Sequence, residues 1–230
     1  LSILNKLGIY AEFNDNTIII KPKKDEIINT EYKVEADWSS ASYFFSIVAL
    51  SKNIELSFLN FRKDSFQGDI NVCKYYELFG VKTTFQNGKL IIKKRTDFNY
   101  PEKIIIDLKD NPDLAQTIIV TAFGLNIPTK LTGLSTLKVK ETDRIEALRN
   151  ELTNLGASCI IDDESIEFFK SNKLNKNYII NTYDDHRMAL AFAPLSVIFP
   201  IEIQDPKVVS KSFPEFWNIL EKLNFSIDFA

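Results

Sequence analysis

The sequence has few of the residues that build metal centres and redox sites. It contains two cysteines and one histidine, His186. A single histidine excludes every multi-histidine metal site and leaves one imidazole for acid–base chemistry. Cys73 and Cys159 lie in a helix-like and a strand-like segment and lack the spacing of metal ligands. We expect buried thiols in a reducing cytoplasm, and no metal.

Long apolar runs, linkers rich in glycine or proline, and a strong excess of one charge are also missing. No apolar run is long enough to span a membrane. The net charge of −3 disfavours general nucleic-acid binding, so any anion site must be a local cluster. With 45% hydrophobic residues, the composition predicts a soluble globular protein of the cytoplasm, with neither membrane nor nucleic-acid partners.

What the sequence does contain is a repeat. Four helix-like segments end in glycine or asparagine, at Gly8, Gly80, Gly156 and Asn224. Each leads into a pair of strand-like segments, and the last pair is cut short by the chain end. Each following unit opens with an aspartate before an apolar helical stretch, at Asp37, Asp113 and Asp185. The unit is helix, strand, polar loop, helix and hairpin, present three times. Such a repeat predicts an α/β fold of pseudo-symmetric units that share a core.

The start of the chain suggests a division into two parts. Residue 1 is leucine, and Leu1–Gly8 reads as the end of a helix whose beginning is absent. We therefore expect a piece of a longer protein. The charged stretch 21–33 is the best boundary candidate. We interpret 1–33 as the remnant of a preceding N-terminal lobe and 34–230 as one compact C-terminal lobe.

The stretch 134–156 changes abruptly from apolar to charged. A strand-like approach through Leu134, Leu137 and Val139 precedes a helix that we expect to begin near Asp143 and stop at Gly156. Its apolar face is Ile145, Leu148, Leu152 and Leu155, and its polar face is Glu146, Arg149, Glu151 and Asn154. Lys140, Glu141 and Arg144 then lie at the positive end of the helix, which favours anions. For this stretch alone, a capped helix start with solvated charges is the favoured interpretation.

Equivalent positions in repeated units should face the same way. Units two and three carry charged residues at such helix starts and loops: Asp113, Lys140, Glu141, Arg144, Arg187, Lys207 and Lys211. Two arginines and several lysines could converge on one small, multiply charged anion. Asp113 and Glu141 are the candidates for proton transfer beside it. The aspartates at the helix starts could instead be simple caps, as we expect for Asp37. We expect His186 to be a packed, hydrogen-bonded structural residue.

Four strings occur in order that together resemble the 5-enolpyruvylshikimate-3-phosphate synthase family, the 3-phosphoshikimate 1-carboxyvinyltransferases. They are Asp-Trp-Ser-Ser-Ala-Ser-Tyr (37–43), Lys-Val-Lys-Glu-Thr-Asp-Arg (138–144), Asp-Asp-His-Arg-Met-Ala (184–189) and Asp-Pro-Lys-x-x-x-Lys-Ser-Phe-Pro (205–214). Gln67-Gly68-Asp69 and Pro112-Asp113 fit the same family. The resemblance extends over essentially all of this chain, which corresponds to only the C-terminal part of a longer enzyme.

The resemblance implies an inside-out α/β barrel lobe of three repeated βαβαββ-type units, the enolpyruvyl transferase fold, with substrates bound between two lobes. It implies a transferase of the shikimate pathway, which leads to chorismate and the aromatic amino acids. The reaction transfers the enolpyruvyl group of phosphoenolpyruvate to the 5-hydroxyl of shikimate 3-phosphate and releases phosphate. It also implies no metal or organic cofactor, and we expect a monomer.

The resemblance also implies roles for single residues. Three would hold phosphoenolpyruvate and its analogue glyphosate: Arg144, Arg187 and Lys211. Lys140 and Asp113 would contact shikimate 3-phosphate, with Asp113 accepting the hydroxyl proton, and Glu141 would handle the proton at the methylene carbon. Thr136 stands where many members carry an asparagine that contacts shikimate 3-phosphate. Trp38 is bulkier than the residue common there, which we interpret as a packing change.

Three alternatives stay open. The enolpyruvyl transferase acting on UDP-N-acetylglucosamine shares the fold and the donor. A non-catalytic α/β repeat module would leave Arg144, Arg187 and Lys211 pointing in unrelated directions. An RNA-end-processing enzyme of similar repeat fold is disfavoured by the acidic balance. In the resembling family the first lobe supplies further substrate ligands, so this chain alone should be inactive and bind either substrate weakly at best.

Overall fold

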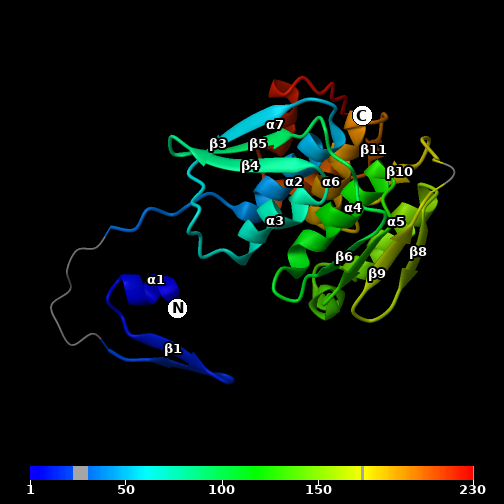
Figure 1. The fold of residues 1–230 in the computed structure, drawn as a ribbon. Coiled ribbons are helices and arrows are strands. Elements are labelled where there is room, and N and C mark those ends of the chain that lie inside the picture. Colours follow the sequence, from blue (N-terminus) through cyan, green and yellow to red (C-terminus); the bar gives the residue numbers. More distant parts are fainter. Residues whose placement is uncertain (23–30, 172–173, 230) are drawn as a thin grey trace.

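The computed structural model describes residues 1–22, 31–171 and 174–229. Its first part is a helix and an antiparallel hairpin: α1 (Ser2–Lys6), β1 (Ala11–Asn14) and β2 (Thr17–Ile20). Figure 1 shows this helix–hairpin unit standing beside the main body of the chain. The Lys6 Nζ lies 4.6 Å from the ring centre of Phe66. Most of the predicted boundary stretch 21–33 lies outside the described residues.

The first helices of the three repeats form the centre of the main body. They are α2 (Trp38–Leu50), α4 (Ala115–Leu125) and α6 (His186–Phe192), which η4 (Ala193–Val197) continues. All but two residues of α2 are buried, and its neighbours on both sides are helices. Because α2 and α4 are predominantly apolar on every side, the only favourable place for them is a core. None of the helices in the described ranges is long and apolar enough to cross a membrane.

Polar side chains show that α2 and α4 run in the same direction. The hydroxyls of Ser42 and Thr117 lie 3.1 Å apart, and one turn further the Thr121 hydroxyl donates to the Ser46 hydroxyl at 2.7 Å. Pairing in this order is possible only if both helices point the same way, which places their N-terminal ends together. Arg187 near the start of α6 bonds Asp113 just before α4, so the third helix begins at the same end.

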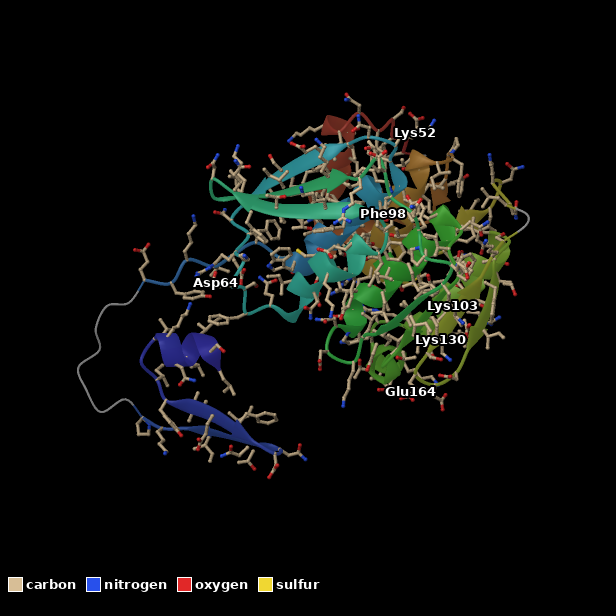
Figure 2. All side chains as sticks on the ribbon, in the orientation of Figure 1. Lys52, Asp64, Phe98, Lys103, Lys130 and Glu164 are labelled. Atoms are coloured by element: carbon tan, nitrogen blue, oxygen red, sulfur yellow. The ribbon has the colours of Figure 1, made fainter. Side chains whose placement is uncertain are left out.

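Strands lie outside these helices, so the fold is inside-out (Figure 1). The first sheet has the order β3-β5-β4, with β3 (Glu55–Leu59), β4 (Val81–Gln86) and β5 (Lys89–Lys94). The second has the order β6-β7-β9-β8, with β6 (Ile104–Asp107), β7 (Thr129–Thr132), β8 (Ser158–Ile161) and β9 (Ile166–Phe169). A third, parallel pair is β10 (Ile179–Ile180) with β11 (Glu202–Ile203). Lys103 and Lys130 mark the polar outer face of the second sheet, where both pair with Glu167 (Figure 2).

The second helices end where the repeat predicts. They are α3 (Val72–Glu77), α5 (Arg144–Asn154) and α7 (Phe216–Lys222). After α1 and these three, Gly8, Gly80, Gly156 and Asn224 have φ angles of 76°, 76°, 102° and 67°. This left-handed conformation is the usual helix stop, and glycine adopts it without the steric penalty of a side chain. Four equivalent stops confirm the repeat, and unit two is a complete βαβαββ unit.

Two expectations about the stretch 134–156 are wrong. The approach to the helix is η3 (Ser135–Val139), a 3-10 helix rather than a strand. Leu134 and Leu137 are fully buried three residues apart while Val139 is 84% exposed, which is the spacing of a 3-10 turn. Glu151, placed on the polar face of α5, is 0% exposed. The segment that follows β9 covers that side of the helix, which periodicity alone does not reveal.

The remaining local expectations are met in most respects. Asp37 caps α2 by accepting from the backbone N–H groups of Ser39 and Ser40. Trp38 is fully buried with its ring edge-on to Phe61 at 4.8 Å between ring centres, so it is a packing residue. The thiols of Cys73 and Cys159 are half-buried rather than fully buried, and burial raises the pKa of each to about 12.

Candidate active site

The charged residues of units two and three meet around one arginine. Arg144 is the first residue of α5, and only 2% of its side chain is exposed. Its guanidinium donates to three carboxylates: from Nε to Asp185 Oδ2 at 2.6 Å, from Nη1 to Asp113 Oδ1 at 2.9 Å and from Nη2 to Glu141 Oε2 at 2.6 Å. The planar fork of arginine suits such an arrangement, because its N–H donors point outward in the plane along separate edges of the group.

Asp185 forms the buried base of this cluster. Its side chain is 0% exposed, and besides Arg144 it accepts from the backbone N–H of Arg187 at 2.8 Å. It therefore both caps α6 and fixes the guanidinium of Arg144. The sequence indicated only a possible cap, because the pairing joins residues 41 positions apart in different repeats. An aspartate that opens a helix beside a charged string was the one signal available.

The accessible rim of the cluster carries the other predicted residues. Arg187 binds Asp113 twice at 3.2 Å, from Nη2 to Oδ2 and from Nη1 to the backbone oxygen. The Lys140 Nζ lies 3.8 Å from Asp113 Oδ1. Side chains of Lys140, Asp113 and Glu141 are 36%, 30% and 38% exposed, so a ligand from solvent can reach them. The cluster thus has a buried Arg144–Asp185 base below a rim of mixed charge.

The surroundings shift the proton affinities of the rim residues. Burial raises the pKa of Glu141, but a backbone hydrogen bond and the charges of Arg144, His186 and Arg187 outweigh it, so the pKa lies below its ordinary value. Burial is also the main influence on His186 and lowers its pKa. Burial lowers the pKa of Arg187, yet nearby Tyr43 and Asp113 raise it overall. At neutral pH Glu141 is therefore an anion, His186 is uncharged and Arg187 is a cation.

Two predicted residues lie outside this network. The Lys211 Nζ donates to the backbone oxygen of Asp184 at 3.3 Å, next to the cap of α6 but not to a cluster carboxylate. Thr136 is exposed in η3 and makes no side-chain hydrogen bond within the described residues. Lys207, offered with Lys211 as a cation of the same loop, is likewise exposed. The structure brings together Asp113, Lys140, Glu141, Arg144 and Arg187.

His186 differs from expectation in one respect. It is packed, with 14% of the side chain exposed, but its buried Nδ1 has no hydrogen-bond partner in the described part of the chain. That nitrogen lies 3.8 Å from Glu141 Oε1 and 3.9 Å from Asp185 Oδ1. These three residues bring potential metal-ligand atoms within 4.8 Å of one another. Arg144 already binds both carboxylates, and Arg187 lies beside them, so the local charge disfavours a metal cation there.

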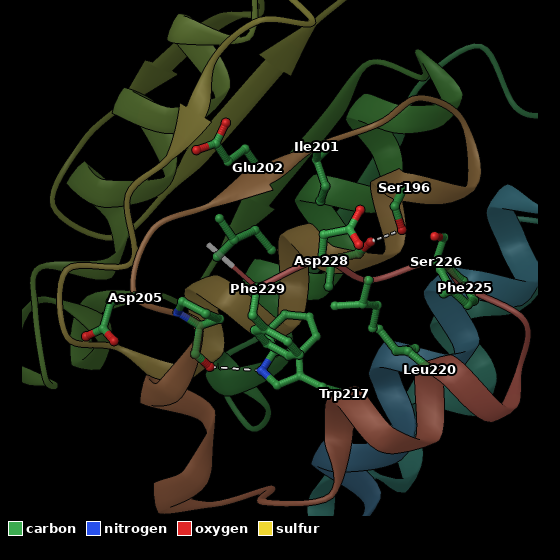
Figure 3. A pocket seen from close by; sticks show the side chains of 14 residues that line it. Ser196, Ile201, Glu202, Asp205, Trp217, Leu220, Phe225, Ser226, Asp228 and Phe229 are labelled. Atoms are coloured by element: carbon green, nitrogen blue, oxygen red, sulfur yellow. Dashed lines mark hydrogen bonds between the residues drawn. The ribbon is translucent and has the colours of Figure 1, made fainter.

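A separate cavity of about 340 Å³ lies between β11, α7 and the C-terminal segment (Figure 3). Its walls are largely apolar, with Ile201, Trp217, Leu220 and Phe225 among them. The Trp217 indole N–H donates to the backbone oxygen of Pro206 at 2.9 Å. None of the seven predicted site residues lines this cavity. The charged cluster, with fixed cations beside ionisable carboxylates, is the better candidate for chemistry on an anion.

Comparison with known proteins decides the family. Residues 1–220 match the model of EPSP synthase (3-phosphoshikimate 1-carboxyvinyltransferase). The chain belongs to the EPSP synthase family. The match confirms the resemblance seen in the four motifs, two of which carry Glu141, Arg144, Asp185 and Arg187.

Relatives in this family match along nearly the whole chain. The 3-phosphoshikimate 1-carboxyvinyltransferase of Bacteroides fragilis (strain YCH46) is 38% identical over 231 residues, covering 99% of this chain and 55% of the relative. That of Pseudoalteromonas translucida is 33% identical, covering 97% and 52%. The chain therefore spans about half the length of the curated EPSP synthase relatives that it matches.

Solved structures establish the fold. The EPSP synthase of Acinetobacter baumannii superposes with a TM-score of 0.72 at 21% identity, covering 96% of this chain and 53% of that one. The enolpyruvyl transferase NikO of Streptomyces tendae gives a TM-score of 0.62 at 15% identity, covering 99% and 52%. The predicted α/β enolpyruvyl transferase fold is confirmed.

Proposed function

We propose that this chain provides half of a 3-phosphoshikimate 1-carboxyvinyltransferase. The complete enzyme transfers the enolpyruvyl group of phosphoenolpyruvate to the 5-hydroxyl of shikimate 3-phosphate and releases phosphate. The observation that carries the proposal is that Lys140, Arg187, Asp113 and Glu141 meet at one accessible rim, directly above the buried guanidinium of Arg144. Cations there offset the charge of the anionic substrates, and the two carboxylates manage protons.

The binding roles follow from charge and geometry. Arg144 and Arg187 offer guanidinium donors to the phosphate and carboxylate of phosphoenolpyruvate, and Lys211 adds a point charge from the neighbouring loop. Lys140 and Asp113 contact shikimate 3-phosphate, with Thr136 at the edge of that subsite. No metal or organic cofactor takes part in this scheme.

The chemical roles comprise three proton transfers in two stages. Asp113 accepts the proton of the 5-hydroxyl as its oxygen bonds to C2 of phosphoenolpyruvate, while Glu141 gives a proton to C3, and a tetrahedral intermediate forms. Glu141 then removes a proton from C3 as the C2–oxygen bond to phosphate breaks, which restores the double bond and frees phosphate. The proton taken up by Asp113 passes to solvent, so both carboxylates return to their initial states. Substrate anions compete for Arg144 and Arg187, so their arrival weakens the hold of both arginines on Asp113 and Glu141. The pKa of Glu141 consequently rises toward the value that a general acid requires.

The organisation of the whole protein is part of the same proposal. Residues 34–230 form one lobe and 1–33 belong to the preceding lobe, which closes over the rim and adds the remaining substrate ligands. The complete protein acts as a monomer in the cytoplasm. Neither the UDP-N-acetylglucosamine enzyme nor a non-catalytic module is favoured by an observation. A module with unrelated surface charges would not direct both Arg144 and Arg187 to Asp113.

Isothermal titration of phosphoenolpyruvate into this chain, with and without shikimate 3-phosphate, tests the proposal. We expect weak binding that Arg187→Ala abolishes, and that the control Arg149→Ala leaves unchanged because Arg149 pairs only with Glu146 in the described residues. Tight binding that survives Arg187→Ala would mean that the anion site lies elsewhere. If the chain alone binds nothing, the same variants in the full-length enzyme provide the test, and unchanged activity there would overturn the assignment.

A further inference from the structure

Glu151 is a buried carboxylate with no cationic partner in the part of the chain that the structure describes. It lies on α5, is 0% exposed, and has no lysine, arginine or histidine within ion-pair distance among the described residues. A buried charge of this kind costs free energy unless hydrogen bonds replace its water shell. A leucine would pack at this position without the free-energy cost of burying a charge, so the carboxylate requires another explanation.

The hydrogen bonds that Glu151 accepts within the described ranges come from one short segment of unit three. Its Oε2 accepts from the backbone N–H of Asn181 at 3.0 Å, and its Oε1 accepts from the Tyr183 hydroxyl at 2.7 Å. The Tyr178 hydroxyl and the Asn181 side-chain amide lie 3.3 Å from the same Oε1. Burial, and then these contacts with Glu151, raise the pKa of Tyr183, so its hydroxyl stays protonated and able to donate. One carboxylate thus organises residues 178–183.

This segment leads directly into the candidate site through an unusual backbone. Tyr183 and Asp184 have φ angles of 55° and 56°, and Asp185 and Arg187 follow at the start of α6. Two consecutive non-glycine residues in the left-handed region are unfavourable, and they persist only where the surroundings fix them. Tyr183 itself is one of the donors to Glu151, so the carboxylate acts on the first of the two strained residues.

Helix α5 therefore holds the segment at two points. Arg144 binds Asp185, just after the strained pair, and Glu151 binds Asn181, before the pair, and Tyr183, its first member. Arg144 and Glu151 are seven residues apart, which places them on the same face of a helix about 10 Å apart along its axis. The contacts with α5, a helix of the preceding repeat, consequently determine the direction in which the Arg187 side chain projects from α6.

We propose that Glu151 is a positioning residue for the anion site. By fixing residues 178–185, it determines where α6 begins and where the guanidinium of Arg187 points. The step from a positioned Arg187 to phosphoenolpyruvate binding rests on the proposed function; the positioning itself does not. A merely stabilising Glu151 would leave the Arg187 guanidinium in place in any variant that still folds.

The nuclear magnetic resonance of the arginine Nε–H groups provides the direct readout. The chain has five arginines, Arg62, Arg95, Arg144, Arg149 and Arg187, so the signals can be resolved individually. In Glu151→Gln we expect the Arg187 signal and the backbone signals of 181–187 to move, while Arg62 and Arg95 keep theirs. Glu146→Gln, the same chemical change at a half-exposed position of the same helix, should leave Arg187 and residues 181–187 unmoved.

Binding adds a second readout. We expect Glu151→Gln to weaken phosphoenolpyruvate binding about ten- to a hundredfold, because the guanidinium of Arg187 is still present but misplaced. A folded Glu151→Gln chain with unmoved Arg187 and 181–187 signals would overturn the proposal. If these signals move while even the unaltered chain binds no phosphoenolpyruvate, the positioning role stands and only the donor-binding part of the proposed function fails.

Tyr183→Phe provides a second test in case Glu151→Gln does not fold. It removes only a hydroxyl, and with it the bond to Glu151, from a side chain that is 37% exposed, so the chain should stay intact. We expect the Arg187 and 181–187 signals to move in the same direction as in Glu151→Gln, by a smaller amount. Unmoved signals in this variant would count equally against the proposal.

Discussion

Arg144 is the residue on which the site depends most. It is nearly inaccessible and binds Asp113, Glu141 and Asp185, which come from three separate segments. Buried ion pairs contribute little to stability compared with a well-packed apolar replacement, but breaking one leaves a charge without compensation. The carboxylates around Arg144 should therefore make its loss costly.

We expect Arg144→Met to lower the free energy of unfolding by about 3–5 kcal/mol, because Asp185 stays buried without its partner. Urea unfolding at neutral pH measures this. The double variant Arg144→Met, Asp185→Asn should recover part of the loss, since the uncompensated charge is removed. Arg149→Met is the matched control and should cost about 1 kcal/mol or less, because that ion pair is exposed. A loss for Arg144→Met as small as the control would contradict the role assigned to Asp185.

His186 should give the protein a distinct dependence on pH. Burial holds its pKa below 6.5, so at slightly acidic pH the unfolded chain binds a proton that the folded chain does not. The contribution of His186 to stability is thus fully present above pH 6.5 and is lost as the pH falls toward the folded-state pKa. Because this is the only histidine, its imidazole signal can be titrated without ambiguity.

The measurement compares unfolding free energies of the original chain and His186→Gln between about pH 5 and pH 7. We expect the original chain to lose more stability than the variant as the pH falls through this range. An imidazole midpoint above 6.5 in the folded chain would show that the neighbouring carboxylates outweigh burial, and that the sign is reversed.

At the scale of elements, the close approach of the central helices depends on Gly124 near the end of α4. A Cβ atom there would lie 2.7 Å from a methyl group of Leu50 on α2 and 2.9 Å from one of Leu195 on η4. Contacts that short require the neighbours to move. Gly124 is thus a packing glycine in a helix, not a turn glycine like Gly80.

Gly124→Ala should consequently destabilise the chain by about 1–3 kcal/mol through overpacking, although alanine is the better helix former by about 1 kcal/mol. Thermal or urea unfolding tests this. Adding Leu50→Val, which shortens the side chain that is met first, should restore part of the loss, whereas Leu50→Val alone should only destabilise. An increase in stability with Gly124→Ala would mean that the three helices can separate at no cost.

At the scale of the whole molecule, the helix–hairpin unit of residues 1–20 has its own exposed apolar surface. Phe13, Ile18 and Ile20 are 58%, 60% and 58% exposed. The core of the main body is built from residues 38–220. This supports the proposed boundary near residue 33, since each part has its own set of internal contacts.

Removal of residues 1–33 should leave a lobe that unfolds in one cooperative transition, with a free energy of unfolding within about 1 kcal/mol of the original chain at neutral pH. Chemical denaturation of both proteins, with the backbone resonance spectrum of 34–230 as a control for the fold, makes the comparison. Loss of cooperative unfolding on deletion would show that the first 33 residues belong to the main body.

By itself the sequence determined the repeat, the family and the identity of the charged residues. Helix stops, hairpin turns and caps are local: Gly80 and Gly156 adopt left-handed φ angles, and Asp37 and Asp143 accept hydrogen bonds from nearby backbone N–H groups. Such features depend on a few neighbouring residues, so a pattern of residue types is sufficient to predict them. From the same repeat we predicted that Arg144 and Arg187 could converge.

Only the tertiary structure decided which partners these residues have. Asp185 was indicated as a possible cap and proved to be the buried partner of Arg144, and Glu151 was predicted on a solvated face and proved to be buried. Val139, predicted in a strand, lies exposed at the end of a 3-10 turn. In the first two cases the partner lies at least 27 residues away in another repeat. Helical periodicity places a polar residue on the side of its helix opposite the apolar face. Whether that side then faces water or a second chain segment depends on how the repeats pack.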